Sequence, residues 1–279
     1  MGRNRTVKMK REERKIIAQR TLDALAEGGY VNAAGQAVDI RAAQHAAEQA
    51  STIIWPDTAL AEARNASQQP SINVYAATTL AAAQSHAQTG QRVAILNFAS
   101  AKNPGGGFLG GSQAQEESIA RSSGLYPCLT RCSEFYRFHK QQNDLCYSDA
   151  LIWSPQVPVL CDDAGNWLEQ PYLVDVVTMA AVNAGAIRQN HTGQSSEVEP
   201  AMRQRMQRLL AFCASQPIER LILGAWGCGV FGNDPAMIAK LFKAIIGQQA
   251  WPFAQIDFAI YDPSPRRATV ALFAAIFND

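Results

Sequence analysis

Apolar residues follow two patterns from residue 72 onward. Short apolar runs, typical of buried strands, predict strands at 72–76, 92–98, 147–154, 172–178, 221–224 and 256–261. Segments with helical spacing of apolar residues predict helices at 78–87, 116–125, 130–141, 197–214, 234–247 and 267–277. Apolar strands that alternate with helices favour a three-layer α/β domain, with a mixed, largely parallel sheet between two layers of helices.

The first seventy residues predict helices only. In the first helical segment apolar residues recur at helical spacing, and Gly28 and Gly29 end the run. The segments that predict helices are 6–28, 38–50 and 56–67. We therefore expect a helical N-terminal extension at 1–70, followed by the α/β domain at 71–279.

Composition and charge narrow the classes of protein that this chain can be. Hydrophobic residues make up 47% of the 279 residues and charged residues 18%, with a formal net charge of +1. This balance argues against a dedicated nucleic-acid binder, and Glu12 and Glu13 interrupt the basic residues of the first helix. No apolar run approaches the roughly 20 residues of a membrane span, and no secretory signal is seen. We expect a cytoplasmic monomer with no membrane partner.

The six cysteines and four histidines do not form a metal-binding pattern. Cys128 and Cys132 stand four apart on a predicted helix, but no second pair follows at the spacing of a zinc site. The histidines are scattered and form no H-x-x-x-H pair. We predict reduced, structural cysteines and no metal ion.

A glycine-rich loop follows the predicted strand at 92–98. It reads N-F-A-S-A-K-N-P-G-G-G-F-L-G-G-S-Q-A-Q-E-E over residues 97–117, and Glu116 and Glu117 open the next predicted helix. Glycines let the backbone approach a ligand closely, and the unpaired N–H groups of a helix N-terminus favour anions. The loop thus combines a candidate phosphate site with a candidate acid/base pair.

A second glycine loop follows the predicted strand at 221–224. Its sequence, G-A-W-G-C-G-V-F-G-N-D-P over residues 224–235, leads into another helix, so backbone amides and a helix start can together hold a diphosphate. Neither loop carries the G-K-[ST] of a P-loop, and the first loop does not match the dinucleotide fingerprint, which is G-x-G-x-x-G with a later ribose-binding acid. Each loop taken alone is equally compatible with a tight turn. Because strands of an open α/β sheet bind ligands at their carboxyl ends, the two loops together favour a binding site.

Both loops match a known family. Pro104-Gly-Gly-Gly-Phe followed by Gln115-Glu-Glu-Ser resembles the signature of the microbial-type poly(ADP-ribose) glycohydrolases, and Gly-Cys-Gly-Val-Phe-Gly at 227–232 resembles the diphosphate loop of their macrodomain fold. The likeness covers roughly residues 70–279. It implies hydrolysis of the ribose–ribose O-glycosidic bond in poly(ADP-ribose) on modified proteins, which removes ADP-ribosylation and releases ADP-ribose as product, with no cofactor.

The resemblance implies different tasks for the two glutamates. Glu117 would protonate the leaving 2′-oxygen and then assist water, whereas Glu116 would hold ribose hydroxyls. Adjacent residues at a helix start diverge by about 100° of rotation, which also favours separate tasks. A general acid that works near neutral pH needs a raised pKa, which burial and a neighbouring carboxylate supply.

Further residues are predicted at the substrate from the resemblance and from their place at strand ends. The first loop would hold the diphosphate against the second loop, and Phe231 would pack on the ribose unless it is a core aromatic. Asn97 would bind the ribose or order the loop, and Gln115 would position Glu116 or contact substrate. The full set is Asn97, Gly105, Gly106, Gly107, Gln115, Asn183, Gly227, Gly229, Val230, Phe231 and Gly232.

Three alternatives stay open at this point. A macrodomain that only binds ADP-ribose has no need of Glu117 beside the glycine loop. A hydrolase of a mono-ADP-ribosyl link to protein or nucleic acid would use the same diphosphate site with another leaving group. A structural or interaction protein would leave both loops without a ligand.

Overall fold

The computed structural model describes residues 9–66, 68–142, 144–190 and 193–278. Its centre is a seven-stranded sheet in the order β3-β6-β7-β5-β8-β9-β4, and β1 pairs with β2 in a separate two-stranded sheet. The bounds of the strands are β1 (Gly29–Val31), β2 (Ala37–Asp39), β3 (Thr52–Ile54), β4 (Ser71–Tyr75), β5 (Val93–Phe98), β6 (Leu151–Cys161), β7 (Trp167–Met179), β8 (Arg220–Leu223) and β9 (Gln255–Ala259).

The large sheet is mixed and mostly parallel, as predicted. The ladders β7–β5, β5–β8, β8–β9 and β9–β4 are parallel, whereas β3–β6 and β6–β7 are antiparallel. Strands β6 and β7 are antiparallel because they form a long hairpin. Its turn begins at Asp162, whose carboxylate accepts hydrogen bonds from the amides of Ala164 and Asn166.

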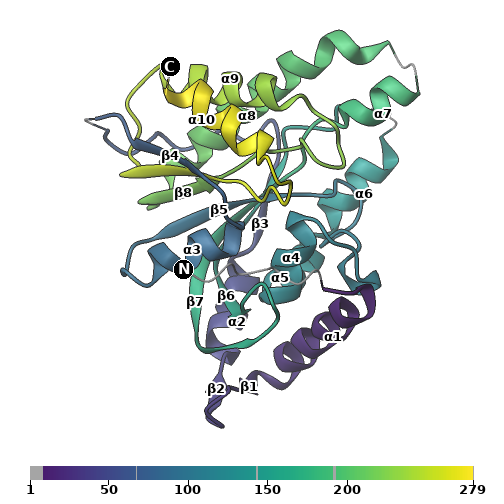
Figure 1. Cartoon of the computed structure of the whole chain (residues 1–279), viewed down its shortest axis with the longest axis vertical. Helices are drawn as coiled ribbons and strands as arrows, with labels where there is room; N and C mark the ends of the chain where they lie inside the picture. Colours follow the sequence, from purple (N-terminus) through teal and green to yellow (C-terminus); the bar gives the residue numbers. More distant parts are fainter. Residues whose placement is uncertain (1–8, 67, 143, 191–192, 279) are drawn as a thin grey trace.

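Helices cover both faces of this sheet (Figure 1). Their bounds are α1 (Arg11–Glu27), α2 (Arg41–Ala50), α3 (Thr79–Ala87), η1 (Phe108–Gly110), α4 (Gln115–Ser122), α5 (Leu125–Arg131), α6 (Ser133–Gln141), α7 (Ala184–Gln189), η2 (Gln194–Glu197), α8 (Val198–Ser215), α9 (Pro235–Ile246) and α10 (Ala268–Asn278).

Strand β5 shows why the sheet is buried on both sides. Ala94 and Leu96 belong to the core cluster that includes residues of α8 and α9. Val93 and Ile95 belong to the other cluster, with residues of α3 and α5. Alternate side chains of a strand point to opposite faces, and a parallel strand covered on both faces therefore reads as a continuous apolar run.

The first seventy residues are less separate than the sequence suggests. Strand β3 pairs antiparallel with β6 and forms one edge of the main sheet, so a domain boundary at residue 70 would cut through the sheet. Helix α1 lies against the first glycine loop, where Arg11 and Arg14 donate to the carbonyl oxygens of Gly110 and Gly111 at 2.7 Å each.

The prediction of helices only before residue 70 is wrong, because β1, β2 and β3 lie there. Two further elements differ from their prediction. The described residues of the segment 56–67 form no helix, because Pro56 lies in a turn closed by the bond from the Thr58 amide to the Trp55 carbonyl. The strand predicted at 147–154 instead runs over Leu151–Cys161. Two prolines within that strand, Pro155 and Pro158, mask it in the sequence.

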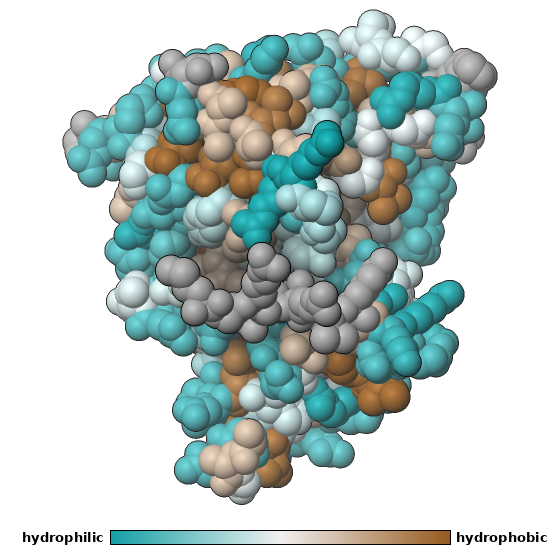
Figure 2. Space-filling view, in the orientation of Figure 1, coloured by the Kyte–Doolittle hydropathy of each residue, from teal (hydrophilic) through white to brown (hydrophobic). Residues whose placement is uncertain are grey.

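The face of the described chain that Figure 2 shows is mostly polar, with apolar side chains gathered over α10. Only Phe273 of that helix is fully buried. Within the described ranges, no helix has both the length and the hydropathy of a membrane span.

Candidate active site

The two glycine loops leave the same edge of the sheet. Strand β5 pairs in parallel with β8, so their carboxyl ends lie side by side and each continues into one of the loops (Figure 1). Strand β7, parallel to β5 on its other side, ends at the same edge. Neighbouring carboxyl ends are the usual place of a ligand site in an open α/β sheet.

The first loop surrounds the carboxyl group of Glu117. The Gly107 amide donates to Glu117 Oε1 at 3.0 Å, and Glu117 Oε2 accepts no hydrogen bond from the described residues. Gly106 has a positive φ of 60°, and a Cβ built on it would lie 2.4 Å from Glu117 Oε1. The loop thus needs glycine at this position, because any side chain would displace the carboxyl group.

Glu116 is fixed more firmly than its neighbour and is only 3% exposed. Its Oε2 accepts from the Ser100 amide at 2.6 Å, and its Oε1 lies 3.4 Å from Asn97 Nδ2. Burial raises the pKa of Glu116 to about 8, against the lowering effect of the Ser100 amide and with a further rise from the charge of Glu117. Glu116 therefore keeps a proton at neutral pH.

The carboxyl groups of the two glutamates converge, although the sequence predicted that they diverge. The Cβ built on Gly106 would lie 3.2 Å from Glu116 Oε2, as well as close to Glu117. Both side chains are long enough to reach this one glycine from adjacent positions of α4. The charge of Glu117 close by is one of the causes that raise the pKa of Glu116.

Asn97 ends up beneath the pair at the end of β5, fully buried. Its Nδ2 donates to Thr178 Oγ1 of the neighbouring strand at 3.1 Å. Its Oδ1 is buried without a partner among the described residues. Since buried polar atoms are normally paired, this oxygen is a candidate acceptor for a substrate hydroxyl.

Gln115 connects the start of α4 to β5. Its Oε1 accepts from the Phe98 amide at 2.8 Å, and its Nε2 donates to the Leu96 carbonyl at 2.6 Å and to Thr79 Oγ1 at 3.1 Å. Both ends of the carboxamide are therefore occupied within the chain. Of the two predicted roles, this geometry supports positioning of Glu116 over contact with substrate.

The second loop presents free amides at its tip. The Gly232 amide donates to Gly229 O at 3.0 Å and the Asn233 amide to Gly227 O at 3.0 Å, which closes the loop into a tight turn. No acceptor in the described chain bonds the amides of Gly229, Val230 or Phe231. Val230 is 86% exposed. Free, neighbouring N–H groups of this kind form an anion-binding concavity.

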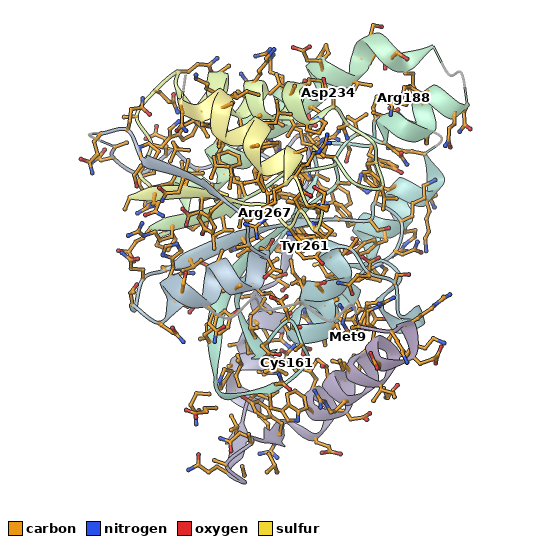
Figure 3. The ribbon with its side chains drawn as sticks, viewed as in Figure 1. Met9, Cys161, Arg188, Asp234, Tyr261 and Arg267 are labelled. Carbon is orange, nitrogen blue, oxygen red and sulfur yellow. The ribbon has the colours of Figure 1, made fainter. Side chains whose placement is uncertain are left out.

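Other groups fix the loop from outside. Arg188 and Asp234 lie close together in the view of Figure 3. Arg188 donates to the Gly232 carbonyl at 2.8 Å, and Asp234 caps α9 by accepting from the Ala236 amide at 3.0 Å. Asn183 likewise caps α7 through the Ala186 amide at 3.1 Å, so the structure gives it a local role, and its contact with substrate stays a prediction.

Comparison with known proteins agrees with this geometry. The family model for the microbial-type PARG catalytic domain matches residues 18–162. A poly(ADP-ribose) glycohydrolase (PARG) structure from Thermomonospora curvata is 42% identical, with 95% of this chain and 100% of that chain covered and a TM-score of 0.89. This chain belongs to the microbial-type PARG family. The macrodomain-like fold expected from the sequence is thereby confirmed.

Two further PARG structures carry ligands. One from Thermomonospora curvata is bound to the inhibitor ADP-HPD, at 41% identity over 95% of this chain and 99% of that chain, with a TM-score of 0.86. One from Deinococcus radiodurans is in complex with ADP-ribose, at 40% identity over 84% of this chain and 96% of that chain, with a TM-score of 0.78. Among curated protein sequences no match was found.

One residue beside the second loop was not singled out by sequence reasoning. The ring of Tyr147 lies 6.0 Å from that of Phe231, centroid to centroid, and the Tyr147 backbone has a positive φ of 59°. The sequence placed Tyr147 at the start of a strand. Nothing in the spacing of its neighbours signals a left-handed backbone, so the pattern could not reveal it.

Proposed function

We propose that this protein hydrolyses ribose–ribose O-glycosidic bonds in poly(ADP-ribose) and releases ADP-ribose. The observation that carries the proposal is the carboxyl group of Glu117, held by the Gly107 amide at 3.0 Å at the edge of the sheet where the second loop presents its amides. A protein that only binds ADP-ribose would not need a carboxyl group fixed beside the loop with one oxygen unpaired.

Glu117 is the proposed general acid and base. Its proton passes to the 2′-oxygen as the bond from that oxygen to the anomeric carbon breaks, which leaves a ribosyl oxocarbenium ion. Water then attacks the anomeric carbon and returns a proton to Glu117. The unpaired Oε2 gives this residue an oxygen for the reaction, whereas Oε1 is used to fix its position.

Glu116 and Asn97 are proposed to hold the ribose. Glu116 is protonated at neutral pH because burial raises its pKa to about 8, so it can donate to a ribose hydroxyl as well as accept. The unpartnered Asn97 Oδ1 can accept from a second hydroxyl. Together they would fix the sugar ring against the acid, which turns binding energy into orientation.

The second loop is proposed to bind the diphosphate. Its amides at Gly229, Val230 and Phe231 are free, whereas the Gly106 amide donates to Asn103 O and the Gly107 amide to Glu117. The predicted sharing of the diphosphate between both loops is therefore supported more strongly for the second loop. In this proposal, the first loop serves mainly to position the acid.

The test is product identification from two substrates. Purified protein is incubated with defined poly(ADP-ribose) and, separately, with mono-ADP-ribosylated protein. The released compounds are separated and identified by mass spectrometry. Release of free ADP-ribose from the polymer by the wild type, and not by Glu117→Gln, is the expected result. Release from the mono-ADP-ribosylated protein alone would favour the alternative hydrolase, and release from neither would favour a binding protein.

The setting of the reaction is proposed from the sequence. We infer a monomer that acts in the cytoplasm on polymer attached to modified proteins, without a cofactor. Size-exclusion chromatography with light scattering tests the oligomeric state, and a dimer at micromolar concentration would contradict it.

A further inference from the structure

Tyr147 has a backbone conformation that its side chain does not favour. Its φ of 59° lies in the left-handed region, which large aromatic residues seldom adopt. Residues held in such conformations persist only where their surroundings fix them, and they cluster at functional sites. This makes the segment around Tyr147 worth tracing to its contacts.

A buried arginine fixes the segment from one side. Arg205 of α8 is 1% exposed, and its Nη2 donates to the Cys146 carbonyl at 2.8 Å while its Nη1 donates to the Ala180 carbonyl at 3.0 Å. Its Nε bonds Asp149 Oδ1 at 3.1 Å. One guanidinium therefore ties the residues on both sides of Tyr147 to the end of β7.

A buried histidine fixes it from the other side. His139 Nδ1 lies 2.8 Å from the Phe135 carbonyl, so this nitrogen carries the proton, and Nε2 accepts from Ser148 Oγ at 2.8 Å. Burial lowers the pKa of His139, which keeps the ring neutral in this arrangement. The edge of the His139 ring also meets the Tyr147 ring, with centroids 5.9 Å apart.

The ring that is held in this way lies where three strand ends meet. It packs against Ala99, after β5, and Ala180, after β7, and a further neighbour is Phe231 of the second loop, after β8. The residue that follows Ala99 donates its amide to Glu116. The Tyr147 ring is partly exposed, and its hydroxyl donates to no described residue.

The geometry points to Tyr147 as a substrate-contacting residue that forms, with Phe231, an aromatic wall for the ribose whose bond is cleaved, and to Arg205 as the residue that positions it. The inference rests on the proposed function. The cleaved ribose is joined to a diphosphate that the amides of the second loop, up to Phe231, would bind. Its glycosidic bond must reach Glu117, so the ribose lies between these two places. The apolar face of a sugar packs well on an aromatic ring.

The first test separates the ring from the backbone. Asn tolerates the left-handed conformation, so Tyr147→Asn removes the ring while keeping the turn, and Tyr147→Phe keeps the ring. In a Glu117→Gln background, calorimetry with ADP-ribose should show Kd about tenfold higher for Tyr147→Asn, the size of one aromatic contact, and unchanged for Tyr147→Phe. Gln156→Asn, at another left-handed position with a φ of 53°, is the matched control and should leave Kd unchanged.

A second measurement does not require that the Tyr147→Asn variant folds. In the Glu117→Gln protein labelled with 3-fluorotyrosine, the fluorine resonance absent from Tyr147→Phe should shift when ADP-ribose is added. A resonance that stays in place, or an unchanged Kd for folded Tyr147→Asn, overturns the inference. If the wild type releases ADP-ribose from the polymer while these results fail, the proposed function stands and the role of Tyr147 alone is wrong.

The positioning role of Arg205 has its own test. Arg205→Lys keeps the charge but cannot make the three separate bonds, so Kd for ADP-ribose should rise severalfold, and adding it to Tyr147→Asn should raise Kd no further. Equal effects of Arg205→Lys with and without the Tyr147 ring would show that the arginine does not act through it.

Discussion

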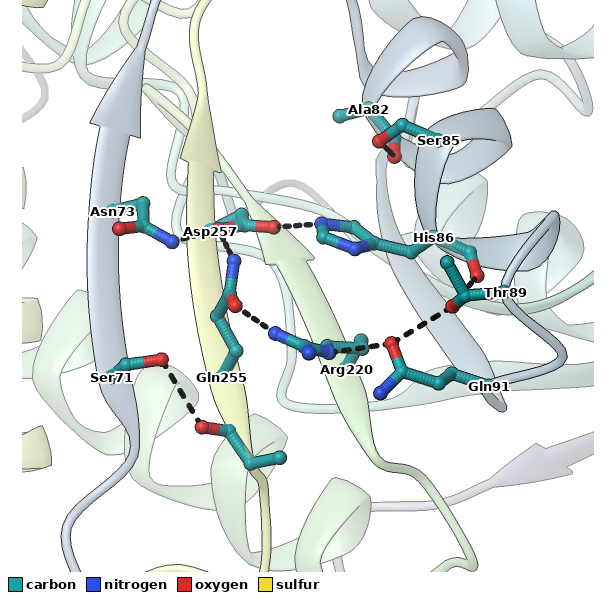
Figure 4. A network of polar contacts seen from close by, with 11 residues as sticks. Ser71, Asn73, Ala82, Ser85, His86, Thr89, Gln91, Arg220, Gln255 and Asp257 are labelled. Atoms are coloured by element: carbon teal, nitrogen blue, oxygen red, sulfur yellow. Dashed lines mark hydrogen bonds and ion pairs between the residues drawn. The ribbon is translucent and has the colours of Figure 1, made fainter.

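Buried carboxyl groups in two parts of the central sheet have different partners. Toward the amino ends of the strands, fully buried Asp175 pairs with Arg92 Nε at 2.7 Å. Asp257, in the middle of β9 and 1% exposed, lies 2.5 Å from His86 Nε2 and accepts from Asn73 and Gln255 (Figure 4). At the carboxyl ends, Glu116 is buried to a similar degree, but its nearest charged neighbour is another acid, Glu117.

The difference teaches that burial alone does not decide what a carboxyl group does. A buried carboxyl group that an arginine or several donors hold is fixed in place and becomes part of the framework. A buried carboxyl group beside a second acid keeps its proton and stays chemically available. Asp175 and Asp257 stabilise the sheet, whereas Glu116 lowers stability and contributes to the site at the carboxyl ends of the strands.

Apart from replacement of Glu117 itself, the largest expected effect comes from filling the space that its carboxyl group occupies. Gly106→Ala places a Cβ where the Glu117 carboxyl group lies, so we expect kcat on poly(ADP-ribose) to fall at least about 100-fold, the usual scale of a general acid, with a smaller change in Kd for ADP-ribose. Gly110→Ala is the control, because its Cβ would meet nothing closer than 3.7 Å. Equal activity of the two variants would mean that the loop does not shape the acid.

Breaking a pair at the amino end should cost stability instead. Asp175→Ala leaves Arg92 and the Gln156 amide without their acceptor. Because the Arg92 side chain is 35% exposed, we expect a loss of about 3 kcal/mol, the lower end of the cost of losing one member of a buried ion pair. Urea unfolding measures this free energy, and ADP-ribose binding by the folded fraction should be unchanged. A loss of binding without loss of stability would contradict the division between the two ends.

Glu116→Gln should raise the free energy of unfolding, whereas Asp175→Ala lowers it. The pKa of Glu116 is raised from 4.5 to about 8 in the folded chain, so between those pH values the folded state holds more protons than the unfolded state. Folding stability therefore falls as pH rises through this range, by a few kcal/mol in all, and Gln removes the loss. Melting temperatures should favour Glu116→Gln over the wild type at pH 9 and differ little at pH 4. A difference that does not vary with pH would contradict the raised pKa.

The smallest effect is expected from the connection between α4 and β5. Gln115→Glu keeps the shape but replaces the donor to Leu96 O with an acceptor, so we expect a loss of about 1–3 kcal/mol in stability and a several-fold loss in kcat as Glu116 shifts. Thermal melting and steady-state kinetics on polymer measure both. A fall in binding alone would instead favour direct contact of Gln115 with substrate.

The sequence alone identified the parts of this site that are marked by particular residue types. The glycines at 105–107, the pair Glu116 and Glu117 and the loop at 227–232 stand out because glycine and acidic residues after a buried strand have few other uses. The strands and helices after residue 72 were mostly predicted, because the parallel sheet needs continuous apolar runs.

What the sequence could not show depends on contacts between distant segments. The convergence of both glutamates on Gly106 depends on how the loop folds back over α4. The position of Tyr147 beside Phe231 depends on Arg205, nearly sixty residues later, and on His139, which hold the residues on either side of it. Strand β3 joins the sheet through pairing with β6, about a hundred residues away, and three residues carry too little pattern to predict it.

The measurement that tests the central claim most directly follows Glu117→Gln on two readouts in one preparation. The variant should release no ADP-ribose above background from poly(ADP-ribose), while calorimetry gives a Kd for ADP-ribose within about threefold of the wild type. Gln keeps the acceptor for the Gly107 amide but carries no transferable proton. Sustained release of ADP-ribose by this variant would show that Glu117 is not the acid.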